Sequence, residues 1–150
     1  MALFDLQDRV AIVTGGNGGI GLAMGQGMAQ AGAVVVVAAR DPVKGEAAVT
    51  ALESLGVRSA FIALDVRDEA SCVNLIETVV ADFGRVDVLV NNAGTNDRKQ
   101  PEEYALAEWQ AIIDTNLTSA FMLSQRVYPV MKNAGGGKII NIGSMMSIFG

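Results

Sequence analysis

The sequence predicts an α/β fold built on a doubly wound parallel sheet. Apolar, β-branched segments alternate five times with segments that favour helix, which is the order of successive βαβ units. Hydrophobic residues make up 51% of the 150 residues and charged residues only 18%, which suits a sheet covered by helices on both faces. Residues 33–39 include four consecutive valines, a composition typical of a fully buried central strand.

The first apolar segment, residues 9–14, leads into the glycine-rich octet TGGNGGIG at residues 14–21. A helix is expected over residues 20–31, with Gly32 as its stop. A glycine turn between a strand and a helix lets the backbone approach a pyrophosphate, and the free N–H groups of the helix start then face that anion. The octet therefore predicts a nucleotide-binding loop. Gly25 and Gly27 lie inside this helix, and close packing on the sheet is the predicted reason for both.

The remaining elements follow the same alternation. Asp41 is expected to cap a helix that opens at Pro42 and ends near Gly56, and Asp68 to cap one that ends near Phe83. A long helical region is expected from residue 101 to about residue 132. The strands are expected at residues 9–14, 33–39, 58–64, 86–90 and 138–142.

The expected strand order is 3-2-1-4-5, that of a Rossmann-type sheet, and residues 1–150 are read as a single dinucleotide-binding domain. Ligands of such sheets bind beyond the carboxyl ends of the strands. A polar or glycine residue comes just after each expected strand: Gly15, Arg40, Asp65, Asn92 and Ser144. We therefore expect these five residues to share one rim. Asn91 is expected to stabilise neighbouring strands.

Composition excludes several classes of function. The net charge of −5 and the absence of a basic run argue against nucleic acid or a membrane surface as partner. The sequence has no histidine, which removes Ser-His-Asp catalysis and the usual zinc sites, so no metal site is predicted. Cys72 is the only cysteine and cannot form an internal disulfide, which favours a cytoplasmic setting. Cys72 itself is expected to be a small packing residue on a helix.

The motifs together resemble the short-chain dehydrogenase/reductase family. The octet matches the family's Thr-Gly-x-x-x-Gly-Ile-Gly signature, and NNAG at residues 91–94 matches its Asn-Asn-Ala-Gly signature. Residues 139–144 look like the strand that delivers the family's catalytic serine. The stretches 96–103 and 144–150 loosely resemble members that act on sugar acids such as gluconate.

The resemblance implies roles for particular residues. Asp65 and Val66 should face the adenine, although Asp65 could instead cap a turn. Asn116 corresponds to the active-site asparagine whose backbone helps hold a water, and Ser144 to the serine that hydrogen-bonds the reacting oxygen. The residues expected to hold the ribose units and phosphates are Gly15, Asn17, Gly19, Ile20, Gly21, Asn92, Ala93 and Gly94.

Arg40 bears on the choice of cofactor. An acidic residue at the end of the second strand favours NAD, whereas an arginine there can pair with the 2′-phosphate of NADP. The strand ends Ala38-Ala39-Arg40 with no preceding acid, so NADP is expected, with NAD possible. The alternative is that Arg40 is a solvated surface residue.

The family's chemistry also requires Tyr-x-x-x-Lys about one helix beyond the serine, past Gly150. Tyr128 and Lys132 match this spacing literally, but they precede the fifth strand, and Pro129 is expected to interrupt the helical spacing between them. We therefore expect either a piece of a longer enzyme, homo-oligomeric when full-length, or a true truncation before the family's last helices and strands. In both cases residues 138–142 form an edge strand, and Met145, Met146, Ile148 and Phe149 lack an evident partner.

The sequence thus predicts an NADP-preferring oxidoreductase that interconverts an alcohol and a carbonyl on a small molecule. A nucleotide-binding or scaffold domain without turnover is the alternative, because the Tyr/Lys pair is absent from the expected position. A methyltransferase-like domain shares a glycine turn after its first strand, but lacks the Ile20-Gly21 ending and the NNAG segment.

Overall fold

The computed structural model describes residues 4–145 and confirms the predicted architecture. Five parallel strands pair in the order β3-β2-β1-β4-β5. Met146, Ile148 and Phe149, for which the sequence suggested no partner, lie outside the described residues. The strands are β1 (Val10–Thr14), β2 (Val34–Ala39), β3 (Ser59–Ala63), β4 (Val88–Asn91) and β5 (Lys138–Asn141).

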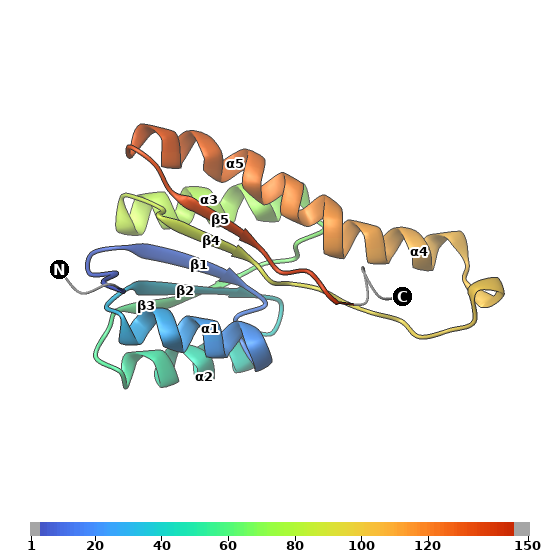
Figure 1. Ribbon diagram of the computed structural model, residues 1–150, viewed down its shortest axis with the longest axis horizontal. Coiled ribbons are helices and arrows are strands. Elements are labelled where there is room, and N and C mark those ends of the chain that lie inside the picture. Colours follow the sequence, from blue (N-terminus) through green and yellow to red (C-terminus); the bar gives the residue numbers. More distant parts are fainter. Residues whose placement is uncertain (1–3, 146–150) are drawn as a thin grey trace.

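Helices cover both faces of the sheet (Figure 1). Helices α1 (Gly19–Gln30) and α2 (Pro42–Glu53) lie on one face, and α3 (Glu69–Phe83) and α5 (Ser119–Asn133) on the other. Successive strand residues alternate between the two cores: Ile12 and Val36 pack on the α3–α5 side, Val13 and Val37 on the α1–α2 side. This is why the central strands are apolar along their whole length.

The predicted helix ends are mostly confirmed. Asp41 Oδ1 accepts a hydrogen bond from the Lys44 N–H at 3.1 Å, and Asp68 Oδ1 accepts one from Ala70 at 3.0 Å. Gly84 ends α3 in the left-handed conformation, with φ 77°. For Gly27 the packing prediction is wrong: a Cβ there meets nothing within 4 Å, whereas Gly25 faces Val35 and Leu52.

The long helical region expected from residue 101 is interrupted. A 3-10 turn η1 (Pro101–Glu103) precedes α4 (Leu106–Ile113), and a π-helical turn η2 (Asp114–Thr118) joins α4 to α5. Figure 1 shows α4 extending beyond the sheet. The π-turn contains Asn116, at the place where the family's active-site asparagine is expected.

The prediction that Pro129 interrupts its helix is wrong, because α5 continues through it to Asn133. Tyr128 and Lys132 therefore stay one turn apart. However, they lie near the end of α5 that precedes β5, at the amino ends of the parallel strands. Tyr128 is 61% exposed there, so the pair is remote from the rim where ligands of such sheets bind.

The predicted edge strand is present, since β5 pairs only with β4 among the described residues. Asn91 stabilises this edge as expected: its Nδ2 donates to Asn141 Oδ1 at 2.8 Å and to Ser124 Oγ at 3.2 Å. Asn91 therefore ties β4 to β5 and to α5. Within residues 4–145 no helix is long and apolar enough to cross a membrane.

Candidate dinucleotide-binding site

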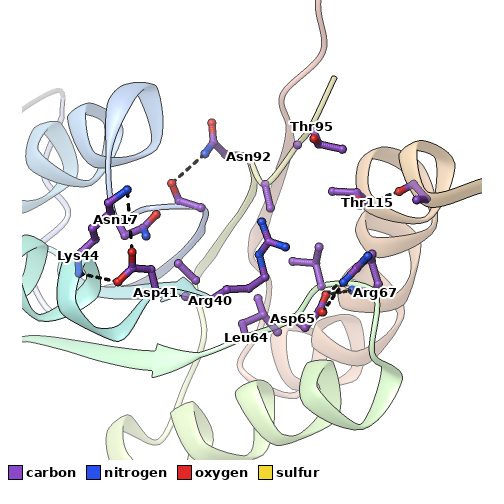
Figure 2. A pocket seen from close by; sticks show the side chains of 17 residues that line it. Asn17, Arg40, Asp41, Lys44, Leu64, Asp65, Arg67, Asn92, Thr95 and Thr115 are labelled. Carbon is purple, nitrogen blue, oxygen red and sulfur yellow. Dashed lines mark hydrogen bonds and ion pairs between the residues drawn. The ribbon is translucent and has the colours of Figure 1, made fainter. Parts of the chain in front are cut away.

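A cleft of about 810 Å³ lies at the carboxyl ends of β1, β2, β3 and β4 (Figure 2). It brings together most of the residues that the sequence assigned to a cofactor. The predicted residues that line it are Gly15, Asn17, Arg40, Asp65, Val66, Asn92, Ala93 and Gly94. Its further lining residues, not singled out from the sequence, include Lys44, Arg67, Thr95 and Thr115.

The glycine loop is shaped by close backbone approach. Gly15 has φ +64°, a conformation that favours glycine, and its N–H donates to Ala38 O at 2.8 Å. A Cβ on Gly21 would lie 2.4 Å from Gly15 O and 2.5 Å from Asn92 Nδ2. These two glycines therefore allow the loop, the start of α1 and the segment after β4 to meet, which is the open backbone cradle that a pyrophosphate requires.

Thr14 ties the two sequence signatures together. Its Oγ1 accepts hydrogen bonds from the N–H groups of Asn92 at 3.0 Å and Ala93 at 2.9 Å, and donates to Val90 O at 3.3 Å. Asn92 Nδ2 returns a hydrogen bond to Thr14 O at 2.9 Å. Thr14 is 1% exposed, so its role is to fix the loop geometry. The sequence showed it only as a member of the octet.

Positive side chains line the β2 side of the cleft. Arg40 follows β2, is exposed, and extends into the cleft (Figure 2). Lys44, on the first turn of α2, also lines the cleft and pairs with Asp41 at 3.9 Å. An anionic group on a ligand in the cleft would meet Arg40 here.

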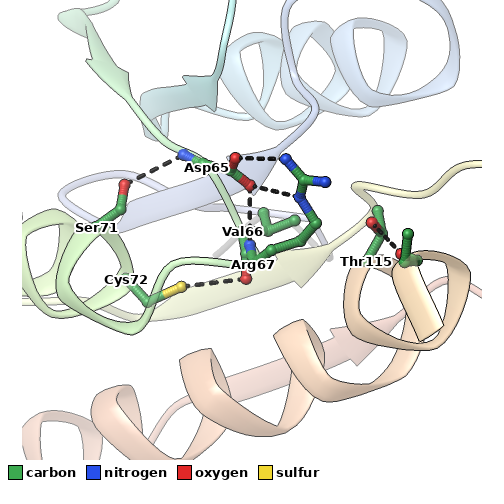
Figure 3. Close-up of polar contacts among 7 residues, drawn as sticks. Asp65, Val66, Arg67, Ser71, Cys72 and Thr115 are labelled. Carbon is green, nitrogen blue, oxygen red and sulfur yellow. Dashed lines mark hydrogen bonds and ion pairs between the residues drawn. The ribbon is translucent and has the colours of Figure 1, made fainter. Parts of the chain in front are cut away.

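Asp65 is held by Arg67, a contact that the sequence did not reveal (Figure 3). Asp65 Oδ1 accepts from the Arg67 backbone N–H at 3.0 Å and from Nε at 3.1 Å, and Oδ2 accepts from Nη2 at 2.8 Å. The side-chain hydrogen bonds from Arg67 lower the pKa of Asp65 to about 2. The carboxylate is thus ionised near neutral pH. The contact with the Arg67 N–H also matches the turn-capping alternative.

The segment that carries Asp65 is held by hydrogen bonds to residues of α3. The Asp65 N–H donates to Ser71 Oγ at 3.1 Å, and Cys72 Sγ donates to Val66 O at 3.5 Å (Figure 3). Cys72 is fully buried, and burial raises the pKa of its thiol to about 11. A neutral, buried thiol is a packing residue, as the sequence predicted.

Asn116 clamps the segment after the NNAG signature. Its Oδ1 accepts from the Thr95 N–H and its Nδ2 donates to Thr95 O, both at 2.8 Å. The π-turn that carries Asn116 therefore holds Thr95, a lining residue of the cleft, by a two-way amide contact. The Asn116 side chain therefore has a structural role. The predicted water-holding role concerns the Asn116 backbone, which these contacts do not use.

The remaining predicted residues do not line the cleft. Gly19 and Gly21 lie at the start of α1 beside it, and Ile20 is 70% exposed. Ser144 follows β5 and is exposed. Across residues 4–145, no cluster of histidine, cysteine or acidic side chains suited to a metal ion is found.

A parallel sheet with a glycine-turn cradle and cations at the carboxyl ends of its strands defines a dinucleotide-binding protein. The family model for short chain dehydrogenases matches residues 9–150. The chain belongs to this family, which confirms the resemblance drawn from the two signatures.

Several known proteins are similar over nearly all of this chain. Gluconate 5-dehydrogenase of Gluconobacter oxydans (strain 621H) is 34% identical over 145 residues, which cover 97% of this chain and 57% of that protein. The chain therefore spans little more than half the length of this relative.

Two solved structures with bound cofactors share the fold. L-sorbose reductase of Gluconobacter frateurii, complexed with NADPH and L-sorbose, matches with a TM-score of 0.94 and 35% identity over 97% of this chain and 56% of that chain. NAD+-bound xylitol dehydrogenase matches with a TM-score of 0.92 and 29% identity over 97% of this chain and 56% of that chain.

Proposed function

We propose that residues 1–150 form the dinucleotide-binding domain of an NADP-preferring oxidoreductase that interconverts an alcohol and a carbonyl on a small polar substrate. The observation that carries this proposal is the cleft, where the glycine cradle and Arg40 open onto one space. When bound, a nicotinamide nucleotide supplies or accepts the hydride. Relatives named for gluconate and L-sorbose support a sugar or sugar acid as substrate.

The chain's own residues would bind and orient the cofactor. The N–H groups at the start of α1 and the residues Gly15, Asn17, Gly19, Ile20 and Gly21 would receive the phosphates and the adjacent ribose. Asp65 and Val66 would lie beside the adenine, and Asn92, Ala93 and Gly94 beside the other ribose. Because Arg67 already pairs with both Asp65 oxygens, an adenine amino group would share that carboxylate with Arg67.

Two residues would act on the substrate side. Ser144 would orient the reacting oxygen by a hydrogen bond. The Asn116 backbone would help to hold a water on a proton path, in a segment kept in place by the amide contact with Thr95. The general acid/base would be a tyrosine other than Tyr128, which lies at the opposite end of the strands.

The cofactor preference is tested by replacing Arg40 with alanine. We expect NADPH affinity to fall about tenfold or more, because a charge-assisted contact with the 2′-phosphate is lost, while NADH affinity changes little. Fluorescence titration with both cofactors measures this. Arg126→Ala is the matched control, since Arg126 pairs with Glu69 outside the cleft and its loss removes the same charge. Equal losses for both cofactors in Arg40→Ala would refute the NADP assignment.

A second candidate is a domain that binds the nucleotide without turnover. This candidate is favoured by the position of Tyr128 and Lys132. They match the Tyr-x-x-x-Lys spacing of the family, but they lie away from the cleft. The two candidates are separated by titrating NADPH and then following its formation from NADP+ with gluconate and related sugar acids. Binding with turnover supports the enzyme, and binding without turnover supports the second candidate.

We also propose that the full-length protein is a homo-oligomer located in the cytoplasm. Large apolar side chains are exposed along α4, η2 and α5, which is more than a solvated helix face normally carries: Leu106, Trp109, Leu117, Phe121 and Tyr128. Light scattering should give a mass above that of one protomer. Trp109→Glu with Phe121→Glu should reduce that mass, and a monomeric wild type contradicts the proposal.

A further inference from the structure

Asn17 and Gly18 form the only Asn-Gly pair of the sequence, and they lie in the glycine loop of the cleft. Asn17 is half-buried and Gly18 is exposed. Within residues 4–145, no hydrogen bond engages the Asn17 carboxamide or the Gly18 N–H. A nucleophilic backbone nitrogen therefore adjoins an unrestrained side-chain amide.

We propose that Asn17 and Gly18 are a self-modification site that converts Asn17 to an acidic residue and thereby weakens cofactor binding. The Gly18 nitrogen attacks Cγ of Asn17, forming an N–Cγ bond and a five-membered imide ring. The Cγ–Nδ2 bond breaks, and the amide leaves as ammonia with the proton from the Gly18 nitrogen. Water then opens the ring to aspartate or isoaspartate. The net reaction is hydrolysis of one amide, without oxidation.

The structure singles out Asn17 among the asparagines at the rim. Asn91, Asn92 and Asn116 each use their side-chain amides in hydrogen bonds to other elements. Each is also followed by a residue with a side chain, which hinders attack by the next backbone nitrogen. At Gly18 there is no Cβ, and even an added Cβ would meet nothing within 4 Å, so the ring has room to form.

The effect on binding rests on the proposed function. A carboxylate at position 17 would stand in the loop that receives the cofactor phosphates, where like charges repel. We expect Asn17→Asp to weaken NADPH binding about tenfold, since charge repulsion at a partly solvated site reaches this size. Bound NADPH should cover the loop and slow the modification of Asn17.

The modification is read by peptide mapping, which does not depend on activity. Cleavage after Arg9 and Arg40 releases residues 10–40, in which Asn17 is the only asparagine. The wild-type chain is aged in mildly alkaline buffer, with and without NADPH, and the peptide is analysed by mass and chromatography. Gly18→Ala is the matched control: Gly18 has an extended φ of 177° that alanine can adopt, and the added Cβ has space.

We expect the acidic peptide to accumulate in the wild type, to be lost in Gly18→Ala, and to form more slowly with NADPH. If peptide 10–40 is converted no faster than the peptides that contain other asparagines, the proposal that Asn17 is a modification site is wrong. Asn133→Asp adds the same charge far from the cleft and serves as the control. If Asn17→Asp binds NADPH as tightly as Asn133→Asp does, the proposed effect of the modification on cofactor binding is wrong. If freshly prepared wild type binds no cofactor, the proposed function fails, while the peptide map still decides whether Asn17 is modified.

Discussion

Replacing Gly21 with alanine is expected to destabilise the fold by about 3 kcal/mol, the upper end of the range for overpacking. The new Cβ would lie 2.4 Å from the backbone oxygen of Gly15 and 2.5 Å from Asn92 Nδ2. Neither atom can move freely, because Asn92 is held by Thr14 and Gly15 is hydrogen-bonded to Ala38. Urea unfolding measures the loss of stability, and NADPH titration should show weakened binding in the protein that still folds.

Gly27→Ala is the matched control for this prediction, since Gly27 lies in the same helix with no atom within 4 Å of an added Cβ. Alanine is favoured over glycine inside a helix, so this variant should gain about 1 kcal/mol. If both variants lose similar stability, the close approach at Gly21 is not the cause of the loss.

The second large effect is expected at Asp87, which joins the start of β4 to the start of β1. Its carboxylate accepts from Arg9 Nη1 at 3.0 Å, from the Val10 N–H at 2.9 Å and from Arg85 Nε at 2.8 Å. Asp87 is 7% exposed. Asp87→Ala leaves a buried N–H and two cations without their acceptor, so we expect a loss of about 3 kcal/mol in the free energy of unfolding. The exposed Asp82→Ala should change it by no more than about 0.5 kcal/mol.

Asp87 also makes this stability depend on pH. Burial alone would raise the pKa of Asp87, but the hydrogen bonds from Arg85, Val10 and Arg9 outweigh burial and lower it below 3.8. A lowered folded-state pKa means that the stabilisation is fully present above the unfolded pKa and is lost as the pH falls through the folded value. The stability difference between wild type and Asp87→Asn should therefore shrink below about pH 4. A difference independent of pH would contradict this account.

Local signals in the sequence were sufficient for the fold and for the residues that share the rim at the strand ends. The continuous apolar composition of β1 and β2 and the caps at Asp41 and Asp68 are local features, because they involve residues close together in the chain. The rim could be predicted because parallel strands end at one edge, so Gly15, Arg40, Asp65 and Asn92 follow from strand order. Boundaries shifted by one or two residues; β4, for example, includes Asn91.

Other predictions required contacts that no local pattern encodes. The helix through Pro129 is held by the packing of Val127 and Met131 in the core, and this packing outweighs the lost hydrogen bond. The side chain of Asn116, in the π-turn, hydrogen-bonds Thr95, which lies 21 residues earlier. The Arg85-x-Asp87 spacing is visible in the sequence, but its partners Arg9 and Val10 are not.

By itself, the sequence determined the order of strands and helices, the glycine turn between β1 and α1, and the family to which the chain belongs. These depend on backbone conformation and on apolar burial, which short segments specify. Only the tertiary structure decided which polar groups hydrogen-bond one another within the chain. These pairs are Arg67 with Asp65, Thr14 with Asn92, and Asn116 with Thr95. Such pairings are set by side-chain directions across separate elements, and they leave Asn17 beside Gly18 without a partner in the described chain.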